Sequence, residues 1–270
     1  MSIIVSVKIN DGIVLAADSA TTFAIGQAYE HAEKIVNLVK GLPLGVMTCG
    51  SGGIGNASIV TLLKDLRSRL SGKDNTRIEW KLDPDNYTME EVTRRVDEFL
   101  QEKAHEADFK WFLLLRICGY SSGKALPEVW QVALLDNAVR HEPNCIQPED
   151  DFGLRWNGEQ EALDRLIIGI GSISDDGLQA VGMTGEQMQK ARDILAPHTY
   201  ENLILPAAPI QDAIELAKFL VETTKGFIRF AVKRAKTVGG PIEIAAITKH
   251  EGFKWIQRKH FYPYELNRPA

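Results

Sequence analysis

The stretch that decides the fold is the N-terminal sequence MSIIVSVKINDGIVLAADSA, residues 1–20. An apolar, β-branched run begins at Ile3, directly after Ser2, and residues 3–9 are typical of a strand. Residues 13–17 are typical of a second strand, and the Asn-Asp-Gly tripeptide between the two runs is a strong hairpin signal. The second strand is apolar at every position, which predicts that both of its faces are covered.

The rest of the chain places strands and helices in groups. Further strands are expected at residues 44–49, 111–120, 128–135, 166–172, 241–248 and 253–256. Helices are expected at residues 56–70, from a capping box at Thr88 to Ala107, at 185–195 and at 209–236. The first of these helices should bury one face, formed by Ile59, Leu62, Leu63, Leu66 and Leu70. Strands come in hairpin-like pairs rather than in βαβ alternation, which predicts an α+β fold with mainly antiparallel sheets.

The chain is expected to form a single domain over residues 1–270, because no linker, internal repeat or low-complexity segment interrupts it. The segment 141–158 (HEPNCIQPEDDFGLRWNG) is acidic and typical of a loop. We therefore expect an insertion near residues 141–165.

Composition restricts the classes of function. The chain has 44% apolar and 25% charged residues, and its net charge of −5 argues against a nucleic-acid partner. Three cysteines at unrelated spacings and six histidines without HExxH or HxH predict neither a disulfide framework nor a metal site. The absence of a signal-like segment and of a long apolar run predicts a cytoplasmic protein without membrane association.

A glycine-rich loop offers one functional alternative. Residues Gly50–Gly55 match GxGxxG between a strand-like run and a helical pattern, which is the context of a dinucleotide-binding loop. Glu79 would then be the acidic residue on the next strand. The pattern alone is weak, and the same glycines are compatible with a close backbone approach before a helix. A nucleotide-binding oxidoreductase therefore remains an alternative, and no other feature indicates a cofactor.

Ser2 suggests a second hypothesis about function. Methionine before a small residue is normally removed in the cytoplasm, and removal of Met1 would leave Ser2 with a free α-amine. The pKa of an α-amine is about 8, so that this group can act as a base near neutral pH. Nucleophile and base would then belong to one residue.

Hairpin register decides whether Asp18 can assist Ser2. A three-residue turn at Asn10-Asp11-Gly12 would place Ile4 opposite Asp18, so that Asp18 and Ser2 share a face as diagonal neighbours about 7–8 Å apart. A two-residue Asp-Gly turn would place Asp18 on the other face.

Three segments carry a resemblance to a known family. The sequences SIIVSVKINDGIVLAADSATT (2–22), AEKIVNL (32–38) and LGVMTCGSGG (44–53) resemble the N-terminal third of proteasome β-type subunits. The resemblance extends to their bacterial relatives, which include the HslV-like peptidase of the HslUV type and the Anbu-like homologues. It implies an N-terminal nucleophile hydrolase with a four-layer αββα sandwich fold.

The resemblance assigns roles to individual residues. Ser2 falls on the nucleophile, Asp18 on the aspartate that closes the second strand, and Lys34 on the lysine that opens the third. Gly50 falls on the oxyanion-hole glycine, and Ser172 is a candidate substitute for the serine of a Gly-Ser-Gly stretch. The sequence departs from the family pattern at supporting positions: Ala20, Ile170, Ala235 and Val238.

The function implied by the resemblance is amide hydrolysis, with a peptide or a small amide as substrate and a serine- or threonine-type peptidase mechanism. A homo-oligomeric ring or spiral is expected, and an ATPase partner is left open. A non-catalytic, proteasome-like assembly subunit is the alternative within the same fold.

Overall fold

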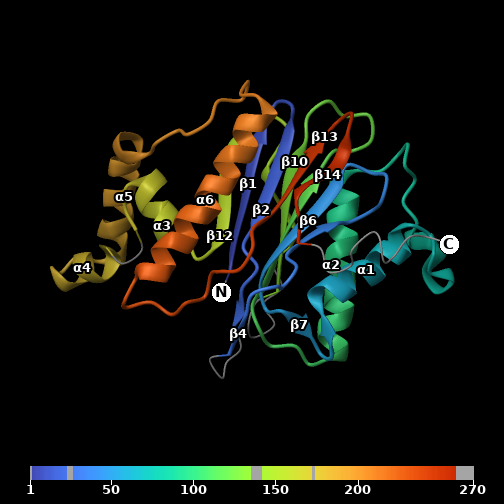
Figure 1. Cartoon of the computed structure of the whole chain (residues 1–270), viewed down its shortest axis with the longest axis horizontal. Helices are drawn as coiled ribbons and strands as arrows, with labels where there is room; N and C mark the ends of the chain where they lie inside the picture. Colours follow the sequence, from blue (N-terminus) through green and yellow to red (C-terminus); the bar gives the residue numbers. More distant parts are fainter. Residues whose placement is uncertain (1, 23–26, 135–141, 172–173, 260–270) are drawn as a thin grey trace.

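The computed structural model describes residues 2–22, 27–134, 142–171 and 174–259 of the 270-residue chain. Two five-stranded sheets form its centre, and helices pack on the side of each sheet that faces away from the other (Figure 1). All strand pairs formed by these residues are antiparallel. The expected α+β fold with mainly antiparallel sheets is therefore confirmed.

The first sheet has the strand order β12-β1-β2-β13-β14. Its strands are β1 (Ile3–Ile9), β2 (Gly12–Ala17), β12 (Gly153–Gly158), β13 (Glu243–Thr248) and β14 (Gly252–Gln257). Strand β2 is buried at every position, as its apolar run predicts, and β1 is buried throughout as well, including Ser6 and Lys8. Side chains alternate between the two faces: Ile3 packs toward helix α6 (Ile210–Phe230), whereas Ile4 packs toward the second sheet.

The hairpin between β1 and β2 has a register that differs from both predicted ones. Ile4 lies opposite Ala17 and not opposite Asp18, because the turn consists only of the dipeptide Asn10-Asp11. Gly12 belongs to the strand, where a Cβ atom would come within 2.3 Å of a backbone oxygen of β13. The glycine that the sequence places in the turn is thus required by the neighbouring strand.

The second sheet has the strand order β11-β10-β9-β6-β5. Its strands are β5 (Ile35–Asn37), β6 (Leu44–Gly50), β9 (Leu113–Gly119), β10 (Glu128–Leu134) and β11 (Asn144–Gln147). Helices α1 (Ile59–Leu70) and α2 (Met89–Glu106) pack on this sheet in one apolar cluster. Thr88 caps α2, and its hydroxyl accepts the N–H of Glu91 at 3.1 Å; the Glu91 carboxylate binds Arg95, so only this half of the predicted capping box forms.

The predicted face of α1 is confirmed, since the same five residues are buried: Ile59, Leu62, Leu63, Leu66 and Leu70. On the first sheet, α6 buries seven residues against β1 and β2: Ala213, Ile214, Ala217, Leu220, Val221, Thr224 and Ile228. A third apolar cluster fills the space between the sheets and joins Ile4 and Leu15 to Met47 and Leu114.

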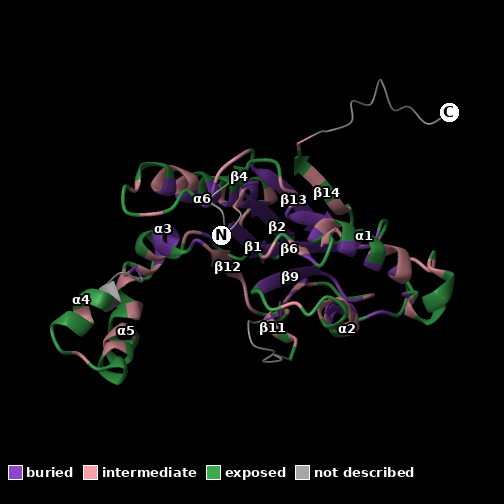
Figure 2. Ribbon diagram, turned by 90° about the horizontal axis from the view of Figure 1, so that it is seen from below, coloured by how far each residue is buried: buried purple, intermediate pink, exposed green. Residues whose placement is uncertain are grey.

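The remaining elements are short or lie at the periphery. They are β3 (Thr21–Thr22), β4 (Ala28–Tyr29), β7 (Gly53–Ile54), β8 (Ala57–Ser58), a 3-10 helix (Asn75–Trp80), α3 (Glu161–Leu163), a π-helical turn (Asp164–Ile168), α4 (Ser174–Ala180) and α5 (Gly185–Thr199). Helices α4 and α5 extend away from the sheets, and α5 has no buried residue (Figure 2). No helix within the described ranges is both long and apolar enough to cross a bilayer.

Two predictions for the middle of the chain are wrong. Residues 166–172 were expected to form a strand, but the π-helical turn continues to Ile168 and ends at Gly169, whose φ is +84°. A short apolar run does not distinguish a strand from a helical segment. The segment 141–158 is not simply a loop, since it contains β11 and β12, and β12 pairs with β1 over six residue pairs. The insertion near 141–165 and the single-domain organisation stay predictions.

Candidate active site

Asp18 lies directly after β2 and binds four donors. Its Oδ1 accepts the backbone N–H of Ile3 at 3.0 Å and the ammonium of Lys34 at 2.5 Å. Its Oδ2 accepts the backbone N–H groups of Ala20 and Gly239, both at 3.0 Å. Charge-assisted hydrogen bonds of this kind fix a carboxylate firmly. The contact between Asp18 and the start of β1 therefore runs through the Ile3 backbone, and not through the diagonal neighbourhood expected from the sequence.

Lys34 and Asp18 form a buried ion pair. Burial lowers the pKa of the Lys34 ammonium, and the negative charge of Asp18 opposes that shift. Lys34 immediately precedes β5, and its carbonyl oxygen accepts the N–H of Thr48 from β6 at 3.0 Å. The second sheet thus holds the lysine backbone, while the first sheet presents the aspartate.

Ser2 is held at the start of β1 by the segment that follows β12. Its carbonyl oxygen accepts the N–H of Glu159 at 2.7 Å, and Ser2 is buried. Gly158 has a φ of +103°, and a Cβ atom on it would lie 1.8 Å from the Ser2 oxygen. Only glycine fits here. Ser2 directly precedes β1, and Ile4, two residues further on, packs toward the second sheet.

Behind Ser2 lies a cluster of two buried glutamates and their cationic partners that sequence reasoning missed. The carboxylate of Glu159 binds Arg234 at 2.6 Å and Thr237 at 3.5 Å. Arg234 also lies 3.4 Å from Glu161, which binds Arg165 at 2.6 Å. These residues come from the segment between β12 and the end of the π-helical turn and from the segment after α6, so no local sequence pattern joins them. The one available signal was the two glutamates, Glu159 and Glu161, within the insertion expected near residues 141–165.

Gly50 ends β6 with an N–H that faces away from β9. Thr48 donates toward Lys34, on the β5 side, and N–H groups two residues apart on a strand point in the same direction. The register leaves no β5 residue opposite Gly50. Its φ is +102°, and a Cβ atom would come 2.5 Å from the Phe112 carbonyl oxygen, so that glycine is required at this position.

A second buried ion pair adjoins Lys34 and was also missed. Glu243 opens β13, and its Oε2 accepts the backbone N–H of Lys34 at 3.4 Å. Lys259 lies 3.3 Å from the same oxygen. Its ammonium also donates to the Ser19 hydroxyl at 2.5 Å and to the Ala32 carbonyl at 2.6 Å. Glu243 and Lys259 are more than two hundred positions from Lys34 in sequence, and no motif marks them.

Two further predicted features are Ser172 and the glycine-rich loop. Ser172 lies outside the described residues. Gly171 packs against the Glu161 carboxylate, where a Cβ atom would come 2.3 Å from an oxygen. The Gly50–Gly55 loop does not lead directly into a helix, because β7 and β8 intervene before α1. That arrangement differs from the strand-turn-helix context of a dinucleotide fingerprint.

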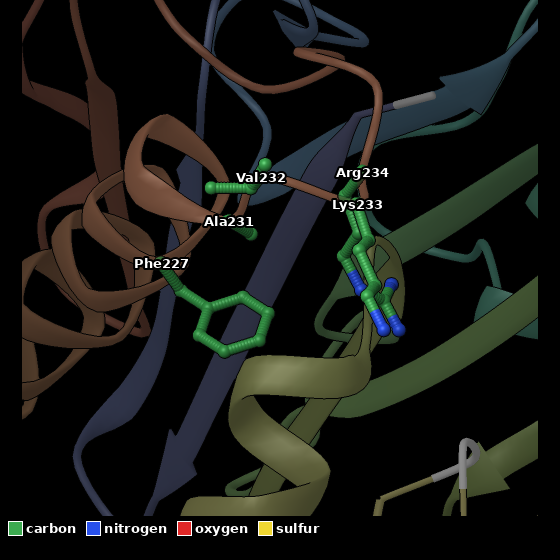
Figure 3. Close-up of a pocket in the computed structure, with 5 residues that line it drawn as sticks. All are labelled: Phe227, Ala231, Val232, Lys233 and Arg234. Atoms are coloured by element: carbon green, nitrogen blue, oxygen red, sulfur yellow. The ribbon is translucent and has the colours of Figure 1, made fainter.

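A shallow pocket lies at the C-terminal end of α6, and neither Asp18 nor Lys34 lines it. It has a volume of about 370 Å³ and is lined by Phe227 and residues 231–234 (Figure 3). Arg234 borders the pocket and also reaches Glu159, so that this pocket lies next to the cluster behind Ser2. Within the described part of the chain, no group of three acidic, histidine or cysteine side chains has an arrangement suited to a metal ion.

Comparison with solved structures supports the fold. The chain is similar to a structure of Anbu (ancestral beta-subunit) from Yersinia bercovieri, with a TM-score of 0.55 and 15% sequence identity. The match covers 96% of this chain and 88% of that chain. No family model and no curated protein sequence matches the chain. At this level of identity the similarity shows a proteasome-like fold and nothing more specific.

Proposed function

We propose that this protein is an N-terminal nucleophile hydrolase with a four-layer αββα sandwich fold that cleaves amide bonds in peptides or small amides. The observation that carries the proposal is the position of Asp18. It binds the Lys34 ammonium and, through the same oxygen, the backbone N–H of Ile3, the residue after Ser2. A buried lysine is thereby held at the very start of β1. The resemblance of residues 2–22 to proteasome β-type subunits supports the same assignment.

The reaction requires removal of Met1, because only a terminal Ser2 has a free amine. The Ser2 amine takes the proton of Oγ, and Oγ attacks the carbonyl carbon of the substrate. The N–H of Gly50 donates to the oxyanion that forms. The protonated amine then gives its proton to the leaving nitrogen, and the amide C–N bond breaks. Water attacks the acyl ester by the same route and releases Ser2.

Lys34 stabilises the negative charge that develops near Oγ, and Asp18 orients it. Because burial lowers the pKa of Lys34, its ammonium loses a proton more readily than that of an exposed lysine. The Glu159 N–H holds the Ser2 carbonyl and so restricts rotation of the nucleophile. The part assigned to Ser172 by resemblance stays a prediction, as do a homo-oligomeric ring or spiral and a cytoplasmic location.

The test is the intact mass of the full-length protein before and after reaction with a serine-reactive electrophile. We expect loss of Met1 and a single adduct on Ser2. Ser2→Ala should abolish the adduct, and Ser2→Thr, which keeps a hydroxyl beside a terminal amine, should retain it. Labelling should increase with pH as the amine loses its proton, with a midpoint at or below about 8.

Two outcomes would support other functions. A chain that keeps Met1, or a processed Ser2 that does not react, would favour the non-catalytic assembly subunit. Saturable binding of a dinucleotide that is lost in a Gly52→Ala variant would favour the cofactor-binding alternative. Gly52 has no positive φ and a Cβ atom there meets nothing closer than 3.4 Å, so this substitution leaves the fold intact.

A further inference from the structure

Lys259 is placed between the two segments that carry the Asp18–Lys34 pair. Its ammonium donates to Ser19, which follows Asp18, and to the carbonyl of Ala32, which precedes Lys34 by two residues. With Glu243 as the third partner, all three donors of the ammonium are used. A lysine two residues after β14 thus ties the aspartate segment to the lysine segment.

Glu243 holds Lys34 from the other direction. Its Oε2 accepts the Lys34 backbone N–H at 3.4 Å, and its residue lies opposite Ala17, at the end of β2. The residue is fully buried, and among the described residues its Oε1 has no hydrogen-bond partner. A carboxylate is retained in such surroundings only where a cation compensates it, and Lys259 supplies that cation.

We propose that Lys259 and Glu243 are positioning residues for Lys34: Lys259 fastens the Asp18 and Lys34 segments together, and Glu243 fixes the Lys34 backbone. The catalytic consequence of this inference rests on the proposed function, but the placement of Lys34 does not. Neither residue is expected to touch the substrate. Both act through Lys34 and Asp18.

The charges around Lys34 predict the direction in which each substitution should shift the pKa of Lys34. Apart from burial, Asp18 raises the pKa of Lys34, Lys259 lowers it, and the buried Cys49 thiol contributes a smaller upward effect. Lys259 itself faces Glu243, Glu33 and Asp18. Removal of the Lys259 charge should therefore raise the pKa of Lys34, and removal of the Glu243 charge should lower it, because Lys259 then stands uncompensated.

The experiment measures the titration of Lys34 directly, in full-length protein labelled with ¹³C and ¹⁵N in its lysines. Lys34→Arg identifies the resonance. We expect Lys259→Met to raise the pKa of Lys34 by about one unit, and Glu243→Gln to shift it in the opposite direction. Lys259→Arg, which keeps the charge, should leave it nearly unchanged.

Lys254→Met is the matched control, because Lys254 lies on β14, five residues before Lys259, with an exposed side chain. Equal titration of Lys34 in Lys259→Met, Glu243→Gln and the wild type would overturn the proposal. Thermal denaturation of each variant identifies those that fail to fold. The opposite signs expected for the two substitutions keep the test decisive, since general destabilisation would not produce them.

Electrophile labelling of Ser2 separates this inference from the proposed function. With both correct, Lys259→Met should slow labelling about tenfold and displace its pH profile, whereas Lys254→Met should do neither. If the wild type does not label but the opposite pKa shifts appear, the hydrolase proposal fails and the positioning role stands. If Ser2 labels and Lys34 titrates alike in all variants, the positioning role fails and the hydrolase stands.

Discussion

The Asp18–Lys34 pair and the Arg69–Glu102 pair each join a carboxylate to a cation, yet they lie in opposite surroundings. Asp18 and Lys34 are buried, with side chains 0% and 6% exposed. Arg69 on α1 and Glu102 on α2 form two parallel hydrogen bonds of 2.9 and 2.8 Å, with side chains 12% and 26% exposed. The two parallel hydrogen bonds give the Arg69–Glu102 pair the better geometry, but both of its side chains remain partly exposed to water.

The difference lies in what else each carboxylate binds. Asp18 accepts three backbone N–H groups from segments far apart in the chain, whereas Glu102 binds only side chains. A buried charge with such partners fixes the backbone around it, and its removal leaves several donors unsatisfied. A pair between two helices adds stability and little else. Four substitutions test this contrast, in order of decreasing effect.

Asp18→Ala should have the largest effect. It leaves Lys34 buried without a counter-charge, together with three unpaired N–H groups, and should lower the free energy of unfolding by about 3–5 kcal/mol. Denaturant unfolding measures that change, and Ser2 labelling should be lost as well. An Asp18→Ala variant as stable as the wild type would show that this pair is no more important than the one on the helices.

Gly158→Ala should come next, because the new methyl group meets the Ser2 carbonyl and the φ of +103° disfavours it. We expect a loss of about 2–4 kcal/mol and strongly reduced labelling of Ser2. Gly153→Ala is the matched control: it has a φ of +104° on the same strand, but its Cβ atom would meet nothing within 4 Å. It should show the backbone strain alone and keep normal labelling.

The fold could be predicted where the pattern that specifies an element lies within the sequence of that element. The spacing of the leucines in α1 fixes its buried face, and the capping residue of α2 is local. The hairpin register could not be predicted, because Gly12 is required by β13, more than two hundred residues away. Strand β12 was missed because its sequence, GLRWNG, has only two apolar residues between glycines and its pairing with β1 is non-local.

The residues of the candidate site likewise divide into those that the sequence identifies and those that it does not. Ser2, Asp18, Lys34 and Gly50 lie within the first fifty residues, where a resemblance can be read position by position. Their supports Glu159 and Lys259 come from remote segments and carry no motif. Such residues can be identified only from contacts in the folded chain. The sequence alone therefore showed only that the supporting residues of the family pattern are absent at their expected positions.

Glu102→Gln should have a modest effect, about 0.5–1 kcal/mol at neutral pH, without any change in Ser2 labelling. Hydrogen bonds from Arg69 lower the pKa of Glu102 from 4.5 to about 2. Because the carboxylate is favoured in the folded state, this contribution is present above pH 4.5 and is lost as the pH falls from 4.5 toward 2. Stability curves of wild type and variant should converge over that interval. Curves that stay parallel would contradict the assignment.

Glu98→Gln should have the smallest effect. The Arg94–Glu98 pair lies on the exposed face of α2, with side chains 58% and 42% exposed. Such pairs contribute about 0.3–0.5 kcal/mol, and salt screens them. The difference from the wild type should vanish in 1 M salt, whereas the effect of Asp18→Ala should persist. An effect of Glu98→Gln that equals that of Glu102→Gln would mean that partial burial adds nothing on these helices.

The hydrogen bond between Asp18 and Gly239 joins positions 221 residues apart. A ribosome that adds 5–20 residues per second needs at least about ten seconds to synthesise the intervening chain. During that time Ser2 has already left the ribosome, while Gly239, the partner of Asp18, and Glu243, the partner of Lys34, do not yet exist. On the proposed function, Ser2 can therefore become reactive only after these last segments have joined the fold.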